Sequence, residues 1–437
     1  MKKIVVCFVF LFSLLKISAQ KVYTLDECIE LAIKNSLLTQ RAELDLQDAG
    51  TDIIQSKQNK IPSVDVGAGH GLNFGRSIDP STNDFINQQI TRGGFYGSAS
   101  LPLWQAGRLN HSIKQFQYAE EASRWALKNE QDNLRLQVIL AYLQVLSNQE
   151  LANRLKIQEA LTSQQLVRLE DMNKNGAVLP SQIADMQGQL ASDQINILDA
   201  NQQINTSKLA LSQLMNIPFD LTMQVAQELD ATQIMNSSTV KANLNEAMGK
   251  HPMIRSFEFT TQSVQSFIQS LKARRYPLVS LNADMGSNYS SAYQVQGQSV
   301  SYVRQVGNNF NYAIGLSLNL PILNNYQLRS GIKKAQTQLN RAQLDLNQSK
   351  NAIQQRIEEA WLLQRNAAEK YRVLEGQVTA FKESFRIAEV RFNQGVLNSV
   401  EYLIVKNNVD RSENQLIAAK YELAFRNKVV EFYAGLK

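Results

Sequence analysis

The fold is decided by residues 108–174, which read RLNHSIKQFQYAEEASRWALKNEQDNLRLQVILAYLQVLSNQELANRLKIQEALTSQQLVRLEDMNK. This stretch contains no proline and no glycine, and its middle, 134–146, is apolar almost all round. A helix of that length measures on the order of 100 Å at about 1.5 Å per residue, whereas helices of soluble proteins average three or four turns. Patterns this long are typical of coiled coils, membrane spans and helical repeats. The charges scattered from Arg124 to Arg154 exclude a membrane span, so the stretch predicts a long coiled-coil rod.

The rod has a second copy 219 positions later in the chain. The segment Leu101-Pro102-Leu103 before it is matched by Leu320-Pro321-Ile322, and Gly176 after it is matched by Gly395. After each glycine, a stripe with three- and four-residue spacing runs from Ile183 to Leu214 and again from Tyr402 to Tyr433. Even its polar interruptions coincide: Asp193 and Ser207 fall opposite Ser412 and Arg426. We therefore interpret the chain as one structural unit built twice.

The N-terminus predicts export. Lys2 and Lys3 precede an apolar run from Ile4 to Leu15, which is typical of a secretory signal over 1–19 with cleavage after Ala19. Cys7 lies inside the apolar run, where it does not mark a lipid-accepting cleavage point. The mature chain then keeps Cys28 as its one cysteine, and its helical spacing with neighbouring apolar residues predicts a buried small side chain.

Composition narrows the class of protein. The full chain carries 45 basic and 39 acidic residues, and loss of Lys2, Lys3 and Lys16 with the signal leaves a nearly balanced chain. This balance argues against a dedicated nucleic-acid surface. The sequence also lacks a segment apolar and long enough for a membrane helix. If the chain enters a membrane, it must do so with strands.

Two pairs of strands are predicted at the same place in each repeat. After Pro62 the period changes from 3.6 to 2, so that Val64 and Val66 alternate with Asp65 and Gly67. We expect strands over 64–75 and 93–103 in the first repeat and over 278–289 and 309–320 in the second. Strict alternation over about ten residues is typical of transmembrane β-strands. The connecting segments 76–92 and 290–308 are long, polar and turn-rich, as expected of outward loops.

Helices are expected on both sides of each strand pair. Thr24 with Glu27 forms a predicted capping box that starts a short helix, continued after Ser36 by an amphipathic helix. The complete expectation is a first repeat, 20–230, with helices 24–60 and 104–215, and a second repeat, 231–437, with helices 241–275 and 324–433.

Alternating strands also build ordinary half-buried sheets. The membrane interpretation is favoured because the strands join directly to long rods, and because their polar faces hold Asn, Ser and Gly with almost no charge. Four strands cannot close a barrel, since small barrels need about eight, and open edges are forbidden in lipid. The protomer is therefore expected to oligomerise.

The chain resembles the outer-membrane efflux proteins of the TolC type over residues 20–437. The resemblance rests on the duplicated helix–strand–strand–helix order, on Leu101-Pro102-Leu103 and Leu320-Pro321-Ile322, and on Arg391-Phe392-Asn393-Gln394-Gly395 with Glu401-Tyr402-Leu403 after it. It implies a mixed α and β membrane protein: a homotrimer with a shared twelve-stranded barrel in the outer membrane and coiled helices forming a periplasmic tunnel. It also implies an export duct that works with a periplasmic adaptor and, through it, an inner-membrane pump.

The resemblance assigns a gate and an adaptor contact to the two interhelical turns. Acidic residues are common in the family six and nine positions after the repeat glycine; Glu401 and Ile404 stand there in the second repeat, and Gln182 and Asp185 in the first. Glu401 and Asp185 are therefore the candidate gate and ion-selective rings, although Glu401 also suits a plain helix start. The candidate adaptor-contact residues at the periplasmic tip are Asn175, Gly176, Ala177, Val178, Leu179, Gln394, Gly395, Val396, Leu397 and Asn398.

The tyrosine that is common three residues before the glycine is replaced by Phe392 here and by Asn173 in the first repeat. The hydrogen-bonded latch of the family is therefore not expected in its usual form.

Other chemistry is poorly supported. The sequence has no HExxH, GxSxG or P-loop motif, so no enzyme and no cofactor are expected. The run Gly67-Ala68-Gly69-His70-Gly71 fits strand alternation better than a phosphate loop. The histidines His70, His111 and His251 lie far apart in sequence, so no metal site is expected. The alternative function is a non-transporting coiled-coil spacer or adhesin of the envelope, which would have no need of strands with one apolar and one polar face.

Overall fold

The structure is a computed structural model, and it describes residues 22–78, 83–174, 176, 178–226 and 248–434. The expected signal peptide 1–19, the expected boundary between the repeats at 230 and 231, and the beginning of the expected helix 241–275 lie outside the described residues. Among the helices that the structure describes, none is both long enough and apolar enough to span a membrane.

The chain forms two compact units, and each contains parts of both repeats. Unit 1 comprises Met1–Leu44, Trp125–Arg255 and Gln348–Lys437, and unit 2 comprises Asp45–Arg124 and Ser256–Asn347. Sequence repeats and compact units are thus different divisions of this chain. The physical reason is that each repeat contributes strands to one shared sheet and helices to shared bundles.

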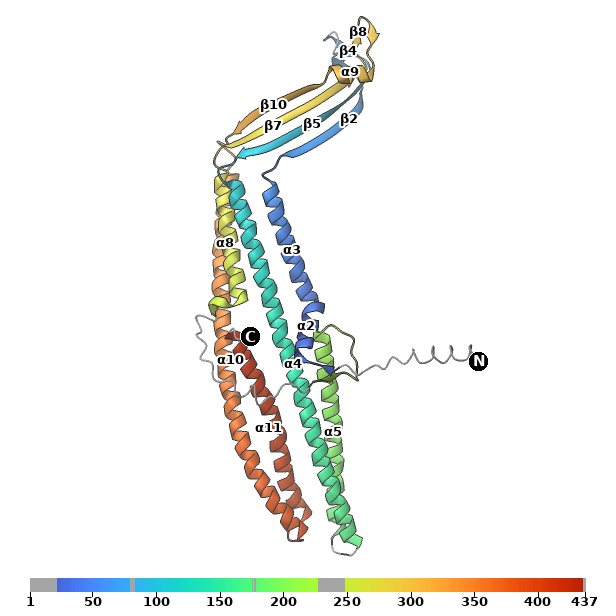
Figure 1. The fold of residues 1–437 in the computed structure, drawn as a ribbon, viewed down its shortest axis with the longest axis vertical. Coiled ribbons are helices and arrows are strands. Elements are labelled where there is room, and N and C mark those ends of the chain that lie inside the picture. The colour runs from blue at the N-terminus through green and yellow to red at the C-terminus, as the bar shows by residue number, and fades with distance from the viewer. Residues whose placement is uncertain (1–21, 79–82, 175, 177, 227–247, 435–437) are drawn as a thin grey trace, which may run out of the picture. The chain divides into compact units, whose positions relative to one another are not determined.

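The long helices reproduce the duplication residue by residue (Figure 1). Helices α4 and α10 each have 67 residues, and α5 and α11 each have 35. The uninterrupted rod over 108–174 is confirmed. The helix bounds are α2 Leu25–Asn35, α3 Leu37–Gln58, α4 Arg108–Lys174, α5 Pro180–Leu214, α8 Pro252–Ala273, α9 Tyr302–Asn308, α10 Gln327–Asn393 and α11 Ser399–Tyr433.

The expected helix 24–60 consists of two helices that meet at Ser36. The capping box at Thr24 is present, with the Thr24 Oγ1 accepting from the Glu27 N–H. Ser36 is extended, with ψ 124°, and its Oγ accepts from the Thr39 N–H at 3.3 Å. The chain therefore ends one helix and caps the next at this serine.

Unit 2 contains an antiparallel four-stranded sheet in the order β10-β7-β5-β2. The pairing of β5 with β7 joins the two repeats. The strand bounds are β2 Ser63–Asn73, β5 Ile90–Trp104, β7 Leu278–Ser290 and β10 Asn311–Asn319. Each lies within a few residues of the strand expected there.

The register places the apolar residues of all four strands on one face. Leu316 pairs with Leu281, and Leu281 pairs with Leu101. On the other face the Ser100 hydroxyl donates to Asn282 Oδ1, and the Asn282 amide donates to the Ser317 hydroxyl, both at 2.9 Å. The expected division into an apolar and a polar face is confirmed.

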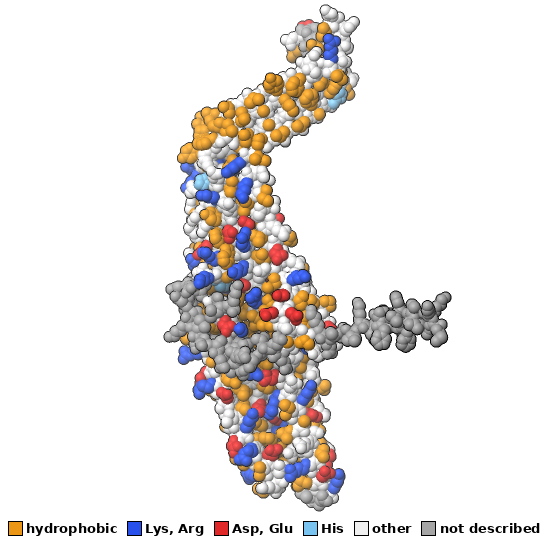
Figure 2. Space-filling view, in the orientation of Figure 1, with side chains coloured by type: hydrophobic (Ala, Val, Ile, Leu, Met, Phe, Trp, Pro, Cys, Tyr) orange, Lys and Arg blue, Asp and Glu red, His pale blue; other side chains and the backbone are white. Residues whose placement is uncertain are grey.

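The apolar face of this sheet is exposed rather than covered by a helical layer. The exposed fractions are 70% for Leu316, 71% for Leu318 and 74% for Val66, and Figure 2 shows hydrophobic side chains crowded over the strands. Soluble antiparallel sheets normally pack such a face against a core. An uncovered face of this kind indicates contact with another apolar surface.

The loops beyond the sheet contain more structure than the expected turns. The segment 76–92 holds a short hairpin, β3 Arg76–Ile78 with β4 Phe85–Asn87. The segment 290–308 holds the hairpin of β8 Gln294–Val295 and β9 Gln298–Ser299, followed by α9. The buried Gln305 ties α9 to its surroundings, since its side-chain amide donates to the carbonyl oxygens of Ser290 and Val300.

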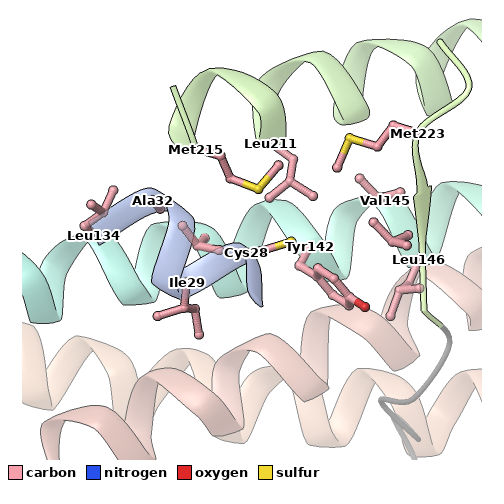
Figure 3. Close-up of a cluster of buried hydrophobic side chains, with 12 residues drawn as sticks. Cys28, Ile29, Ala32, Leu134, Tyr142, Val145, Leu146, Leu211, Met215 and Met223 are labelled. Carbon is pink, nitrogen blue, oxygen red and sulfur yellow. The ribbon is translucent and has the colours of Figure 1, made fainter. Parts of the chain in front are cut away.

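The core of unit 1 near the start of the chain is built from α2, α4 and α5 (Figure 3). Cys28 is fully buried in it, as expected. The buried Tyr142 donates its hydroxyl to the Ala226 carbonyl at 2.6 Å, next to the parallel pair of β1 Val22–Tyr23 with β6 Gln224–Val225. This core packs α2 and the last turn of α5 against the middle of α4.

Candidate functional site

The glycines of the two interhelical turns have the same left-handed backbone conformation. Gly176 has φ +69° and Gly395 has φ +74°, a left-handed conformation that glycine adopts without steric cost. At the second turn the Val396 N–H bonds the Arg391 carbonyl and the Gly395 N–H bonds the Phe392 carbonyl. This pair of bonds is the Schellman motif, which explains why the rod stops at this glycine.

The two turns lie side by side in unit 1. Leu169 of α4, Met186 of α5, Phe392 of α10 and Tyr402 of α11 form one buried apolar cluster. A hydrogen bond from the Arg168 guanidinium to the Asn393 carbonyl at 3.3 Å adds a polar contact between the hairpins. The tips of both repeats are therefore held together.

The two predicted carboxylates lie at this end of the unit but have different surroundings. Glu401 is exposed in the first turn of α11, where its N–H bonds the side chain of the N-cap Asn398 at 2.9 Å. Asp185 is half-buried, and its Oδ2 accepts from the Ser399 hydroxyl at 2.7 Å. Asp185 thus links α5 to the start of α11. The Glu401 carboxylate, by contrast, has no hydrogen-bond or ion-pair partner among the described residues.

The candidate tip residues separate into exposed and packed groups. Val178 and Leu397 are half-buried against the cluster at the turns. Asn175 and Ala177 lie outside the described residues. The exposed members are Gly176, Leu179, Gln394, Gly395, Val396 and Asn398.

An aromatic hydroxyl is present near the second glycine, although not at the position that the family resemblance implies. Tyr402 is fully buried and stacks on Phe392 with ring centroids 4.4 Å apart. Its hydroxyl has no hydrogen-bond partner among the described residues. Burial, with smaller contributions from Glu389 and Asp410, raises the pKa of this hydroxyl well above its usual range. The tyrosine therefore packs as an apolar side chain rather than forming a latch.

A buried ionic network lies further along the same helices, and sequence reasoning missed it. The Lys406 ammonium on α11 is 2.6 Å from Asp410 Oδ2 and 3.4 Å from Asp193 Oδ2 on α5. Lys406 is fully buried, and Asp193 also accepts from Thr162 of α4 and from Gln189. Burial raises the pKa of the Asp410 carboxyl, and the neighbouring Lys406 opposes that shift. A buried cation between two carboxylates fixes α5 against α11.

Two further ion pairs connect the hairpins of the two repeats, and a third lies within the second hairpin. Glu413 of α11 pairs with Arg154 of α4 and, at 3.0 Å, with Lys382 of α10. Lys420 of α11 is 2.6 Å from Glu150 of α4. The sequence contained one signal for this network, the interruption of the apolar stripe at Asp193, but it did not show which cation lies opposite.

In the described part of the chain, no group of three His, Cys, Asp or Glu residues is placed so that it could hold a metal ion. His251 precedes α8, and its Nδ1 accepts from the Met253 N–H at 3.3 Å. Burial, together with the charge of Arg356, lowers the pKa of His251 to about 4. This histidine acts as a neutral cap at the start of α8.

Comparison with known proteins gives a family and a fold. The sequence profile of the family described as outer membrane efflux protein matches residues 28–216 and 243–435. No curated protein matches the sequence.

Several solved structures share the fold. The outer-membrane protein VceC of Vibrio cholerae has 14% identity and a TM-score of 0.77, with 94% of this chain and 97% of VceC covered. CusC has 14% identity and a TM-score of 0.79, with 94% and 91% covered. The open-state MtrE channel of Neisseria gonorrhoeae has 16% identity and a TM-score of 0.76, with 94% and 89% covered.

Proposed function

The chain belongs to the outer membrane efflux protein family, and we propose that it forms, as a homotrimer, the passive export duct of a tripartite system with a periplasmic adaptor and an inner-membrane pump. As a member of this family it is an outer-membrane protein that acts in efflux, with a helical part in the periplasm. The observation that carries the proposal is the sheet of unit 2, whose apolar face is uncovered.

The edges of the sheet support the trimer. β2 and β10 are the edge strands, and every residue of β10 is exposed. Backbone groups left unpaired in a bilayer cost several kcal/mol each, by order of magnitude. Pairing β2 of one protomer with β10 of the next would satisfy both edges, and three protomers would then give a closed barrel of twelve strands. The polar ladder of Ser100, Asn282 and Ser317 would line its lumen.

The mass of the detergent-solubilised full chain tests this assembly. A trimer is expected, because an open four-stranded sheet has no stable arrangement in a micelle or bilayer. In planar bilayers the same preparation should give single-channel steps. A stable, folded single-chain species would overturn the barrel, and a trimer without conductance would leave the envelope spacer as the better function.

The exposed residues of the two turns are the proposed adaptor contact. Leu179 is 66% exposed and Val396 is 63% exposed, and apolar side chains this open at a helix tip favour a protein partner. Replacing both by Asp should abolish site-specific cross-linking to the adaptor while the trimer mass stays unchanged. Equal cross-linking of wild type and variant would place the adaptor elsewhere.

The gate is proposed at the same turns. In a trimer Glu401 and Asp185 would each be present three times, and rings of carboxylates favour cations and bind divalent ions. Glu401→Gln should therefore reduce both cation preference and block by divalent cations added on the periplasmic side. The matched control is Glu369→Gln, an exposed carboxylate on α10 paired with Arg372. Unchanged selectivity and block in Glu401→Gln would leave Glu401 only as a residue that starts α11.

A further inference from the structure

A cavity of about 180 Å³ lies in unit 2 where three joints between strands and helices meet. Gln105 and Arg108 line it from the joint of β5 with α4, and Arg274 and Tyr276 from the joint of α8 with β7. Asn319 at the end of β10 completes the polar lining, and Pro277, Leu278 and Pro321 add an apolar rim. All of these residues belong to one protomer and one compact unit.

The backbone that shapes this cavity is repeated in both halves of the chain. Ala106 and Gly107 have φ +50° and +78°, and their counterparts Asn325 and Tyr326 have φ +50° and +63°. Left-handed backbone at non-glycine residues is uncommon and costs about 1–2 kcal/mol per residue. The same pair of left-handed residues therefore precedes α4 and α10.

Two arginines line the cavity, and none of its lining residues is acidic. Arg108 is half-buried, and its Nε donates to Gln105 Oε1 at 2.6 Å. Burial and the charge of Arg274 together lower the pKa of the Arg108 guanidinium. Neither arginine forms an ion pair within the described part of the chain. Arg274 is exposed and Arg108 is partly buried. Their like charges repel each other, and an anion bound between them would reduce that cost.

The surrounding helix ends are basic as well. The segments 53–64, 101–119, 259–283 and 318–344, which flank the four joints, contain no Asp or Glu. Their basic residues are Lys57, Lys60, Arg108, Lys114, Lys272, Arg274, Arg275, Arg329, Lys333, Lys334 and Arg341, and several blue side chains are visible on the helices next to the sheet in Figure 2. Over the whole chain the two signs are nearly balanced. The concentration of positive charge here draws anions towards the cavity.

We propose that this cavity is a binding site for a phosphate-class oxyanion, with Arg108 and Arg274 as its cationic ligands and the side-chain amides of Gln105 and Asn319 as further donors. Planar guanidinium groups bind phosphate oxygens in pairs of charge-assisted hydrogen bonds. The anion comes either from a phospholipid headgroup beside the sheet or from a free phosphate or phosphorylated solute. Because one protomer lines the cavity, the site does not depend on the proposed trimer or on conduction.

The site is tested by isothermal titration calorimetry of inorganic phosphate into the purified full chain. The protein is kept in an uncharged, phosphate-free detergent solution. The test variant is the double substitution Arg108→Gln with Arg274→Gln. The expected loss of affinity is roughly tenfold per arginine, since a hydrogen bond to a charged group contributes about one factor of ten. The matched control, Arg329→Gln with Lys333→Gln, removes two charges from the same basic segments but none from the cavity lining, and it should bind almost as wild type does.

A second experiment, with lipids, identifies the source of the anion. Native mass spectrometry of the full chain from nanodiscs of phosphatidylglycerol or phosphatidylcholine measures retained lipid. Retention of phosphatidylglycerol by wild type and its loss in the double variant assign the site to a headgroup. Phosphate binding that the double variant loses, with equal lipid retention in both proteins, assigns it to a free anion.

Two results would overturn the site. One is the same binding of phosphate and of phosphatidylglycerol by wild type and the double variant. The other is an equal loss in the control variant, which would show general attraction by the basic segments instead of a site in the cavity. Arg108→Lys with Arg274→Lys keeps both charges and should retain partial binding. Trimer mass and conductance measured on the same variants keep this test separate from that of the proposed duct.

Discussion

Replacing Lys406 by Met should strongly destabilise unit 1, because the substitution removes the buried cation and leaves the carboxylates of Asp193 and Asp410 in place. The side chain of Lys406 is 1% exposed, and those of Asp193 and Asp410 are 8% and 14% exposed. Methionine fills a similar volume, so the substitution changes charge far more than packing.

The magnitude follows from the burial of the network. An exposed ion pair contributes about 0–1 kcal/mol, whereas removing one partner of a buried pair costs about 3–5 kcal/mol because the remaining charge is uncompensated. Lys406 lies in the second category, so the expected loss in the free energy of unfolding is about 3–5 kcal/mol. Lys420→Met is the matched control on the same helix: Lys420 and Glu150 are 22% and 37% exposed, and the expected cost is below about 1 kcal/mol.

The pH dependence gives a second check with a defined sign. Burial already raises the pKa of Asp410 in the folded chain above its unfolded value. A carboxyl with a raised folded pKa destabilises the fold increasingly as the pH rises through that pKa, and this penalty disappears when the pH falls and the carboxyl is protonated. Without Lys406 the Asp410 carboxyl loses the cation that opposes this shift, so its pKa rises further. The destabilisation of Lys406→Met should therefore be largest near neutral pH and smaller near pH 4.

The assay is denaturant unfolding of the full chain in detergent, followed by helical circular dichroism at both pH values. Adding Asp193→Asn and Asp410→Asn to Lys406→Met removes the stranded charges and should recover part of the loss. If Lys406→Met costs no more than Lys420→Met, or if its cost does not depend on pH, the network is solvated and the burial argument fails.

Three further predictions test other parts of the structure. Leu316→Arg should destabilise the membrane-inserted oligomer by about 2–4 kcal/mol if this residue lies near the bilayer midplane, whereas Ser317→Arg on the polar face should be tolerated better. Equal yields of inserted oligomer for the two variants would show that this assignment of the inner and outer faces is wrong. Gly395→Ala should destabilise the second turn by about 1–2 kcal/mol because of its positive φ alone, since nothing lies within 4 Å of the added methyl. Gly188→Ala inside α5, where space is also open, should instead stabilise the chain by about 0.5–1 kcal/mol in the same denaturant-unfolding assay. Because the pKa of His251 is lowered to about 4, wild type should lose stability as the pH falls from about 6.5 towards 4, and His251→Gln should flatten that part of the pH–stability curve; a curve unchanged by the substitution would mean that His251 is solvated.

The sequence by itself determined the local architecture of this protein. The absence of proline and glycine over 108–174 fixed an uninterrupted helix, because nothing in the stretch breaks the backbone hydrogen bonds. Gly176 and Gly395 marked the turns, because only glycine readily takes the left-handed conformation that ends each rod. Alternation with a period of two fixed which residues share a face of the sheet, since neighbouring side chains on a strand must point to opposite sides. Each of these signals lies within a few residues of the feature that it predicts.

The tertiary structure decided which distant side chains meet. Lys406 and Asp410 have the spacing of an ordinary exposed helical pair, and only the packing of α11 against α5 buries them beside Asp193. Arg108 and Arg274 come from different repeats, and they share a cavity because β5 and β7 pair across the repeats. Periodicity assigns a residue to a face but does not specify its partner on another element. The partner follows from how the hairpins and strands of the two repeats pair in the folded chain.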